Sequence, residues 1–171
     1  MSSTDPDRMY IKRPRAAASD APRPPFFVLA LGSALGTGYA PVASGTVGSA
    51  FAVALWWFVP GFDHPLFLAS TILLTLLAGI PAAAAMERLY GEDPSQVVID
   101  EVVGQWIALL FLPKTLLAAA LAFAAFRAFD ILKPPPVRQL DAMHGGTGIM
   151  LDDVAAGCYA LAVVHLALLV L

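Results

Sequence analysis

The sequence predicts an all-α, polytopic membrane protein: a helical bundle of about four or five membrane helices, preceded by an apolar segment that glycines interrupt. Two observations lead to this fold class. Hydrophobic residues make up 58% of the 171 positions and charged residues only 13%, whereas an ordinary soluble domain carries about 25% charged residues. A chain this small with so few charges cannot cover an apolar core with polar surface, so lipid must cover part of it. In addition, residues 24–62 contain no Asp, Glu, Lys or Arg.

The first 25 residues differ from the rest because they are polar and rich in proline and cations. The next apolar stretch has no cleavage site of the signal-peptide kind and runs directly into more apolar sequence. We therefore predict a disordered cytoplasmic tail over residues 1–25. At this length, residues 26–171 form one membrane-embedded domain.

The uncharged stretch after the tail is too long for one span, and glycines interrupt its first half. It predicts a short glycine-broken apolar segment at 26–38, a loop at 40–46 and a helix at 47–59. Residues 60–65 form a turn, because they combine two prolines, a glycine and an aspartate. Residues 66–86 are an uncharged run long enough to span a bilayer, and 87–96 read as a polar loop.

Two further helices, at 97–112 and 115–132, are separated by Pro113-Lys114. Pro113 could kink one long helix or lie in a hairpin turn between two. The hairpin is favoured because its legs are comparable, at roughly 20–25 Å, whereas a continuous helix would separate Asp100 from Asp130 by about 45 Å. Residues 133–147 form a Pro/Gly-rich loop, and 152–171 make the last helix.

The distribution of Lys and Arg predicts how the protein is oriented in the membrane. With the tail in the cytoplasm, the loops at 87–96 and 133–147 are also inside. Nine of the ten Lys and Arg residues then lie at the inner side, and the outer turns hold only Lys114. This asymmetry is what the positive-inside rule expects.

The same topology places five carboxylates at the inner face, at one depth and beside the 40–46 loop. They are Asp100, Glu101, Asp130, Asp152 and Asp153. Ionised groups at membrane depth are costly unless they are paired, hydrated or metal-bound. A divalent cation such as Mg²⁺ would hold one or two carboxylates and keep sites for water and a substrate phosphate. Helix capping is the alternative interpretation for the two acidic pairs, but it does not explain Asp130, which ends a helix.

Phosphate-binding candidates lie close to these acids. Arg127 and Lys133 flank Asp130, and Arg138 and His144 follow in the next loop. Guanidinium and ammonium groups suit phosphate oxygens, although anchoring to anionic lipid would also use such residues. Thr46, with Gly45, opens a predicted helix whose free N–H groups favour an anion.

Four motifs in order resemble those of the phosphatidylglycerophosphatase A family. They are the glycine-rich stretches 36–41 and 45–49, the acidic helix start 98–104, the segment 126–138, and the segment 144–157. The resemblance covers about residues 26–160. One departure is Ser44, where the family usually has proline, and it removes no candidate ligand.

The resemblance implies an all-helical, Mg²⁺-dependent phosphatase of the bacterial inner membrane with its active site on the cytoplasmic face. Such an enzyme, a phosphoric monoester hydrolase, converts phosphatidylglycerophosphate to phosphatidylglycerol. By position, metal and acid/base roles fall to Asp100, Glu101, Asp152 and Asp153, with Asp130 in support. Candidates for binding the substrate phosphate are Thr46, Arg127, Lys133, Arg138 and His144.

Two other functions remain open at this stage. A CDP-alcohol phosphotransferase would share the membrane, the Mg²⁺ and the substrate type, but it needs a longer array of spaced Asp, Gly and Arg. A small cation transporter or channel subunit could use the carboxylates for a permeating ion, although transporter sites lie near the midplane and these acids fall at helix ends. We expect a phospholipid substrate and no nucleic-acid partner, and the sequence does not indicate an oligomeric state.

Overall fold

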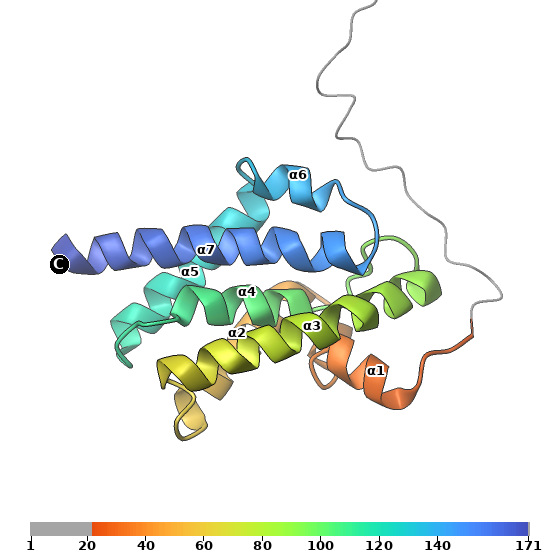
Figure 1. The fold of residues 1–171 in the computed structure, drawn as a ribbon, viewed down its shortest axis with the longest axis horizontal. Helices are drawn as coiled ribbons and strands as arrows, with labels where there is room; N and C mark the ends of the chain where they lie inside the picture. The colour runs from red at the N-terminus through yellow and green to blue at the C-terminus, as the bar shows by residue number, and fades with distance from the viewer. Residues whose placement is uncertain (1–21, 171) are drawn as a thin grey trace, which may run out of the picture.

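The computed structural model describes residues 22–170, and this part of the chain consists of helices joined by turns and loops, with no strand (Figure 1). The elements in order are α1 (Phe26–Gly32), the short 3₁₀ helix η2 (Thr37–Tyr39), α2 (Ser44–Phe58), α3 (Pro65–Tyr90), α4 (Ile99–Leu109), α5 (Leu116–Leu132), α6 (Val137–Asp141) and α7 (Gly146–Val170). The prediction of an all-α bundle is confirmed. The predicted tail lies outside the described residues except for its last four positions.

The short helix α4 is the centre of the bundle. Ten of its eleven residues are buried, and it packs against α2, α3, α5 and α7. A helix that is apolar on nearly all sides is stable only when other elements surround it. The two acidic residues in its first turn, Asp100 and Glu101, are therefore carried into the interior of the molecule.

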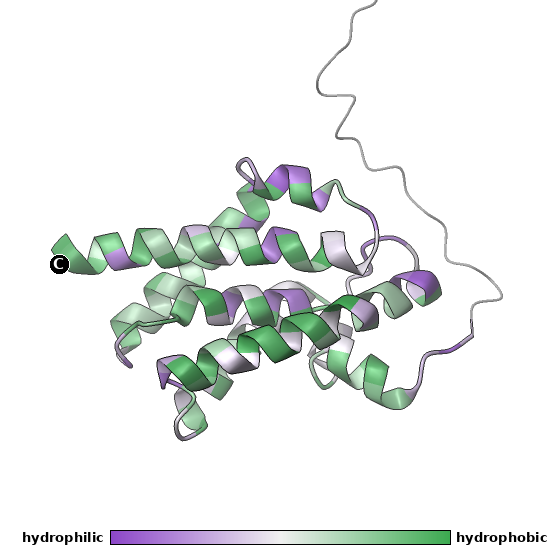
Figure 2. Ribbon diagram, in the orientation of Figure 1, coloured by the Kyte–Doolittle hydropathy of each residue, from purple (hydrophilic) through white to green (hydrophobic). Residues whose placement is uncertain are grey.

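Only α3 and α7, among the described helices, are long and apolar enough to cross a membrane, at 26 and 25 residues. Both helices are coloured mainly as hydrophobic in Figure 2. Large hydrophobic side chains are exposed along both, including Leu73, Leu77 and Leu166. The predicted four or five membrane helices are thus not confirmed. The helices α2, α4 and α5 have 15, 11 and 17 residues, fewer than the roughly 20 that the hydrocarbon core requires.

Several predicted boundaries were wrong at the polar ends of helices. Helix α2 begins at Ser44 rather than residue 47, and α3 continues through Tyr90, so residues 87–90 are helical rather than loop. Helix α7 begins at Gly146, six residues earlier than predicted. Its early glycines suggested a loop, but Gly146 packs against the backbone of Ile80 in α3, where a side chain would not fit.

The structure resolves the choice at Pro113 in favour of the hairpin. Helix α4 ends at Leu109 and α5 begins at Leu116, with Phe111 at a φ of 63° in the turn between them. The side chain of Thr115 caps α5 by accepting a hydrogen bond from the N–H of Ala118 at 3.2 Å. The ring of Phe126 in α5 then packs at Gly104, so α5 folds back along α4.

Candidate active site

Glycines at a helix crossing bring the acidic residues together. A Cβ at Gly104 of α4 would lie 2.6 Å from the carbonyl oxygen of Asp153, and a Cβ at Gly157 of α7 would lie 2.5 Å from that of Gly104. Asp100 precedes Gly104 by four residues and Asp153 precedes Gly157 by four, so each acid lies one turn before its glycine on the same helix face. Because the two helices run in the same direction there, the acids meet.

Three carboxylates form the cluster that results: Asp100, Glu101 and Asp153. One oxygen from each lies within 4.8 Å of the others. Asp100 and Asp153 are 8% and 3% exposed, and all three carry a buried oxygen without a hydrogen-bond partner among the described residues. Unpaired buried anions this close together are costly, and carboxylate oxygens are the hard donors that a divalent cation such as Mg²⁺ prefers. The donor set therefore fits a divalent cation.

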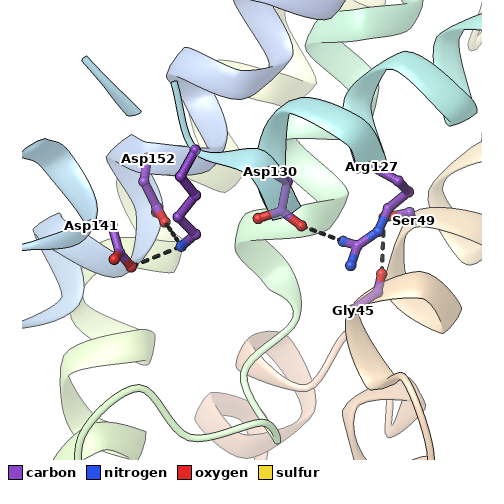
Figure 3. A network of polar contacts seen from close by, with 7 residues as sticks. Gly45, Ser49, Arg127, Asp130, Asp141 and Asp152 are labelled. Carbon is purple, nitrogen blue, oxygen red and sulfur yellow. Dashed lines mark hydrogen bonds and ion pairs between the residues drawn. The ribbon is translucent and has the colours of Figure 1, made fainter. Parts of the chain in front are cut away.

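Asp152 lies beside this cluster but has a different partner. Its Oδ2 is 2.8 Å from Lys133 Nζ, which is also 2.8 Å from Oδ1 of Asp141 in α6 (Figure 3). Burial alone would lower the pKa of Lys133, but the two ion pairs outweigh it and raise that pKa above its usual range. Lys133 is thus a permanent cation held between two carboxylates, and Asp152 Oδ1 is left buried and unpaired.

Asp130 and Arg127 form a second ion pair, between side chains one turn apart on α5. Arg127 Nη1 is 2.7 Å from Asp130 Oδ2, and the two side chains are 17% and 15% exposed (Figure 3). The charge of Asp130 acts on both Asp153 and Glu101, and that of Arg127 acts on Glu101. This pair therefore adjoins the cluster and supplies its nearest guanidinium.

The start of α2 closes the site from another side. A Cβ at Gly45 would collide with Glu101 Oε1 and lie 3.2 Å from Arg127 Nη1. Ser49, one turn later, donates to the carbonyl of Gly45 at 2.8 Å (Figure 3). Thr46 follows Gly45 in the same first turn and is half-buried. The N–H groups in the first turn of α2 have no carbonyl partner within the helix. This turn lies beside Glu101 and Arg127.

Two predicted phosphate-binding residues lie further out. Arg138 is exposed on α6, and His144 Nε2 lies 3.4 Å from Glu92 Oε1 with 49% of its side chain exposed. Neither contacts the three-carboxylate cluster within residues 22–170. Asp152 and Asp153 also do not cap α7, because they lie two turns inside it.

Sequence reasoning missed Asp141 and Gln105. Asp141 holds Lys133, and nothing in its local sequence signals this because the contact depends on how α6 folds back. Gln105 is fully buried, and both polar atoms of its amide lack a partner among the described residues. It follows Glu101 by one turn in an otherwise apolar stretch, and that spacing was a usable signal.

Comparisons with known proteins extend over most of the chain. Residues 30–168 match the family described as Phosphatidylglycerophosphatase A. A Bacteroides thetaiotaomicron protein named "Putative phosphatidylinositol-3-phosphatase" is 41% identical over 85% of this chain and 96% of its own length. Proteins named Phosphatidylglycerophosphatase A from Escherichia coli K12 and Haemophilus influenzae are 33% and 38% identical, each over 82% of this chain and over 82% and 86% of their own lengths. No solved structure matches.

Proposed function

The chain belongs to the phosphatidylglycerophosphatase A family, and we propose that it hydrolyses the terminal phosphate monoester of phosphatidylglycerophosphate to give phosphatidylglycerol, with Mg²⁺ as cofactor. The observation that carries this proposal is the cluster of Asp100, Glu101 and Asp153, whose oxygens lie within 4.8 Å of one another with buried, unpaired lone pairs. Neither a CDP-alcohol phosphotransferase nor a cation transporter gains support from the family.

The choice of substrate rests on the family and on two of the relatives. A third relative carries a name that specifies a phosphatidylinositol phosphate instead. Both substrates are phosphate monoesters on a lipid headgroup, so the carboxylate cluster serves either. Phosphatidylglycerophosphate is preferred here because the family and both of its named members specify it.

Asp100, Glu101 and Asp153 would hold Mg²⁺, which supplies positive charge for the phosphoryl oxygens and lowers the pKa of a bound water. Arg127, held in place by Asp130, would bind a phosphate oxygen together with the first-turn amides at Gly45 and Thr46. These contacts orient phosphorus for attack in line with the leaving glycerol oxygen.

Water is the nucleophile in this proposal. As its oxygen bonds to phosphorus, one of its protons passes to a carboxylate, for which the unpaired Oδ1 of Asp152 is suited because Lys133 fixes Oδ2. The bond from phosphorus to the glycerol oxygen breaks, and that oxygen takes a proton from an acidic side chain or a water. Direct attack by an aspartate to give an aspartyl-phosphate is the competing route.

We place the enzyme in the bacterial inner membrane, with α3 and α7 crossing the bilayer and the active site on the cytoplasmic face. The distribution of Lys and Arg, nine against one, supports this orientation. The exposed leucines of α3 and α7 support contact with lipid. A site at this interface suits a substrate whose headgroup lies in water while its acyl chains stay in the bilayer.

The direct test is Mg²⁺-dependent release of inorganic phosphate from phosphatidylglycerophosphate by the purified protein. Asp153→Asn and Glu101→Gln remove a ligand charge without changing shape, and each should lower turnover at least about a hundredfold. Asp63→Asn, in the turn at the opposite end of the molecule, is the matched control and should keep full activity.

Phosphatidylinositol 3-phosphate is assayed in parallel, and faster turnover of it would reverse the substrate assignment. Full activity in both cluster variants would remove the basis of the proposal.

A further inference from the structure

A cationic cavity lies away from the carboxylate cluster, between the residues that lead into α1 and the last turns of α3. It has a volume of about 280 Å³ and is lined by Pro22, Arg23, Pro24, Pro25, Val28, Ala85 and Arg88. Since a water molecule takes about 30 Å³ in the liquid, this is room for a phosphodiester group. The lining contains two guanidiniums and no carboxylate.

Three of the six Lys and Arg residues within 22–170 form no ion pair there, namely Arg23, Arg88 and Arg138, and Arg23 and Arg88 line the same cavity. By contrast, Lys114, Arg127 and Lys133 each hold an aspartate. Two exposed arginines that face one cavity without a counter-ion repel each other and favour an anion between them. The charge of the cavity therefore specifies an anionic ligand.

The surroundings indicate which anion. Phe26 and Phe27, which follow Pro25 of the lining in the sequence, are 85% and 71% exposed. The three prolines offer no N–H, and the guanidiniums of Arg23 and Arg88 are the charged donors of the lining. A segment that combines exposed arginines with exposed aromatic side chains is typical of the membrane surface, where such residues meet phospholipid phosphates.

A tyrosine pair lies at the same end of the molecule. The hydroxyls of Tyr39 and Tyr90 are 3.1 Å apart, and Arg23 interacts electrostatically with Tyr39. The hydrogen bond to Tyr90, with burial, raises the pKa of Tyr39 to about 12. Tyr39 therefore stays neutral at physiological pH and adds no negative charge that would oppose an anion.

We propose that Arg23 and Arg88 bind the phosphate of an anionic phospholipid of the surrounding membrane, at a site separate from the catalytic carboxylates. The bound lipid is a phosphodiester and is not hydrolysed. It ties the segment before α1 to the end of α3 at the level of the headgroups. This site does not depend on the phosphatase chemistry.

The test uses the full chain in detergent and titrates it with dihexanoyl phosphatidylserine, dihexanoyl phosphatidylcholine or inorganic phosphate, followed by calorimetry. The wild type should bind the anionic lipid and not the zwitterionic one. The double variant R23Q/R88Q should lose at least about tenfold in affinity, because it removes two charge-assisted contacts. R13Q/R15Q removes two cations from the N-terminal segment and should bind like the wild type.

Each other outcome overturns the assignment. Equal binding of both lipids would show that the site does not select a headgroup with a net negative charge, and unchanged binding by R23Q/R88Q would show that the two arginines do not hold the lipid phosphate. Displacement of the lipid by inorganic phosphate at similar concentration would identify a site for a free anion. Turnover of the phosphatase substrate, measured in the same preparations, should be unchanged in R23Q/R88Q and reports that the protein is folded.

Discussion

Gly45 shows how a single missing side chain can matter for catalysis. A Cβ at this position would collide with Glu101 Oε1, so Gly45→Ala should push that carboxylate out of the cluster. We expect turnover to fall by about tenfold or more and the Mg²⁺ concentration needed for half-maximal activity to rise, since loss of correct ligand placement weakens metal sites by such factors. Phosphate release measured across a Mg²⁺ titration tests this. Ala50→Val enlarges an exposed position of the same helix, and a similar loss there would contradict the explanation.

Lys133 has two partners of unequal importance. Asp141 is 30% exposed at its side chain and Asp152 only 8%. Lys133→Met leaves Asp152 buried and uncompensated, which should destabilise the protein by about 1–3 kcal/mol, whereas Asp141→Asn should cost about 1 kcal/mol or less. Thermal unfolding in detergent should therefore rank Lys133→Met below Asp141→Asn, and the reverse order would contradict the assignment of Asp152 as the main partner.

The raised pKa of Lys133 also fixes how this contribution depends on pH. A lysine whose pKa is higher in the folded state than in the unfolded state stabilises the protein fully below the unfolded value of about 10.4. The contribution is then lost as the pH rises through the folded value. Between pH 8 and 9, above the range in which its carboxylate partners change protonation, the difference in stability between wild type and Lys133→Met should consequently stay constant. A difference that shrinks within this window would show that Lys133 titrates much earlier than its ion pairs allow.

At the level of elements, the crossing of α4 and α7 sets the geometry of the cluster. Gly104→Ala would place a methyl group 2.6 Å from the backbone oxygen of Asp153 and against the ring of Phe126, and backbone cannot give way. The helices must then separate, at a cost of about 1–3 kcal/mol, and turnover should fall as Asp100 moves away from Asp153. Thermal unfolding and phosphate release are the measurements.

Gly79→Ala is the matched control for this crossing. It adds the same methyl group at another contact with α7, but there it meets the Cε and Sδ atoms of Met150 at 2.7 and 3.1 Å. These atoms end a flexible side chain that can adopt another rotamer. Stability and activity should therefore stay close to wild type, and an equal loss at both glycines would contradict the argument from backbone contact.

Much of the element order followed from the sequence, and the errors share one cause. The uncharged runs and Pro113 predicted α3, the α4–α5 hairpin and the meeting of Asp100-Glu101 with Asp153, because polar residues mark the ends of apolar helices. The first turns of α7 were missed because Gly146 and Gly148 suit a loop and a tight contact equally well. Local sequence does not distinguish these, since the neighbour that excludes a side chain comes from a distant segment.

The predicted number of membrane spans is not confirmed, for a related reason. Hydropathy records that α4 is apolar but not whether lipid or protein surrounds it, and the structure surrounds it with protein. In the same way, Lys133 was predicted to bind phosphate because it lies near the acids. Its engagement by Asp141 depends on the fold of α6, which a Pro/Gly-rich segment does not reveal.

For the molecule as a whole, the two ends of α3 differ in what surrounds them. Just before its start, Asp63 pairs with Lys114 of the α4–α5 turn, the one cation proposed to lie on the outer side. Its last turns lie beside the beginning of α7, where Glu87 accepts a hydrogen bond from the N–H of Gly145 at 3.4 Å. At 1.5 Å per residue, the 26 residues of α3 separate these ends by about 39 Å, enough to cross the hydrocarbon core.

This separation makes the proposed topology testable by labelling. Cys158 is the only cysteine, so Cys158→Ser gives a thiol-free background for His64→Cys and Gln139→Cys, which are both exposed positions at opposite ends. With the cation-rich end inside, a membrane-impermeant maleimide should label residue 64 in intact cells and residue 139 only in inverted vesicles. Both variants should retain phosphatase turnover, which shows that they are folded. Labelling of both positions from the same side would mean that α3 does not cross the bilayer, and the cytoplasmic placement of the active site would then have no support.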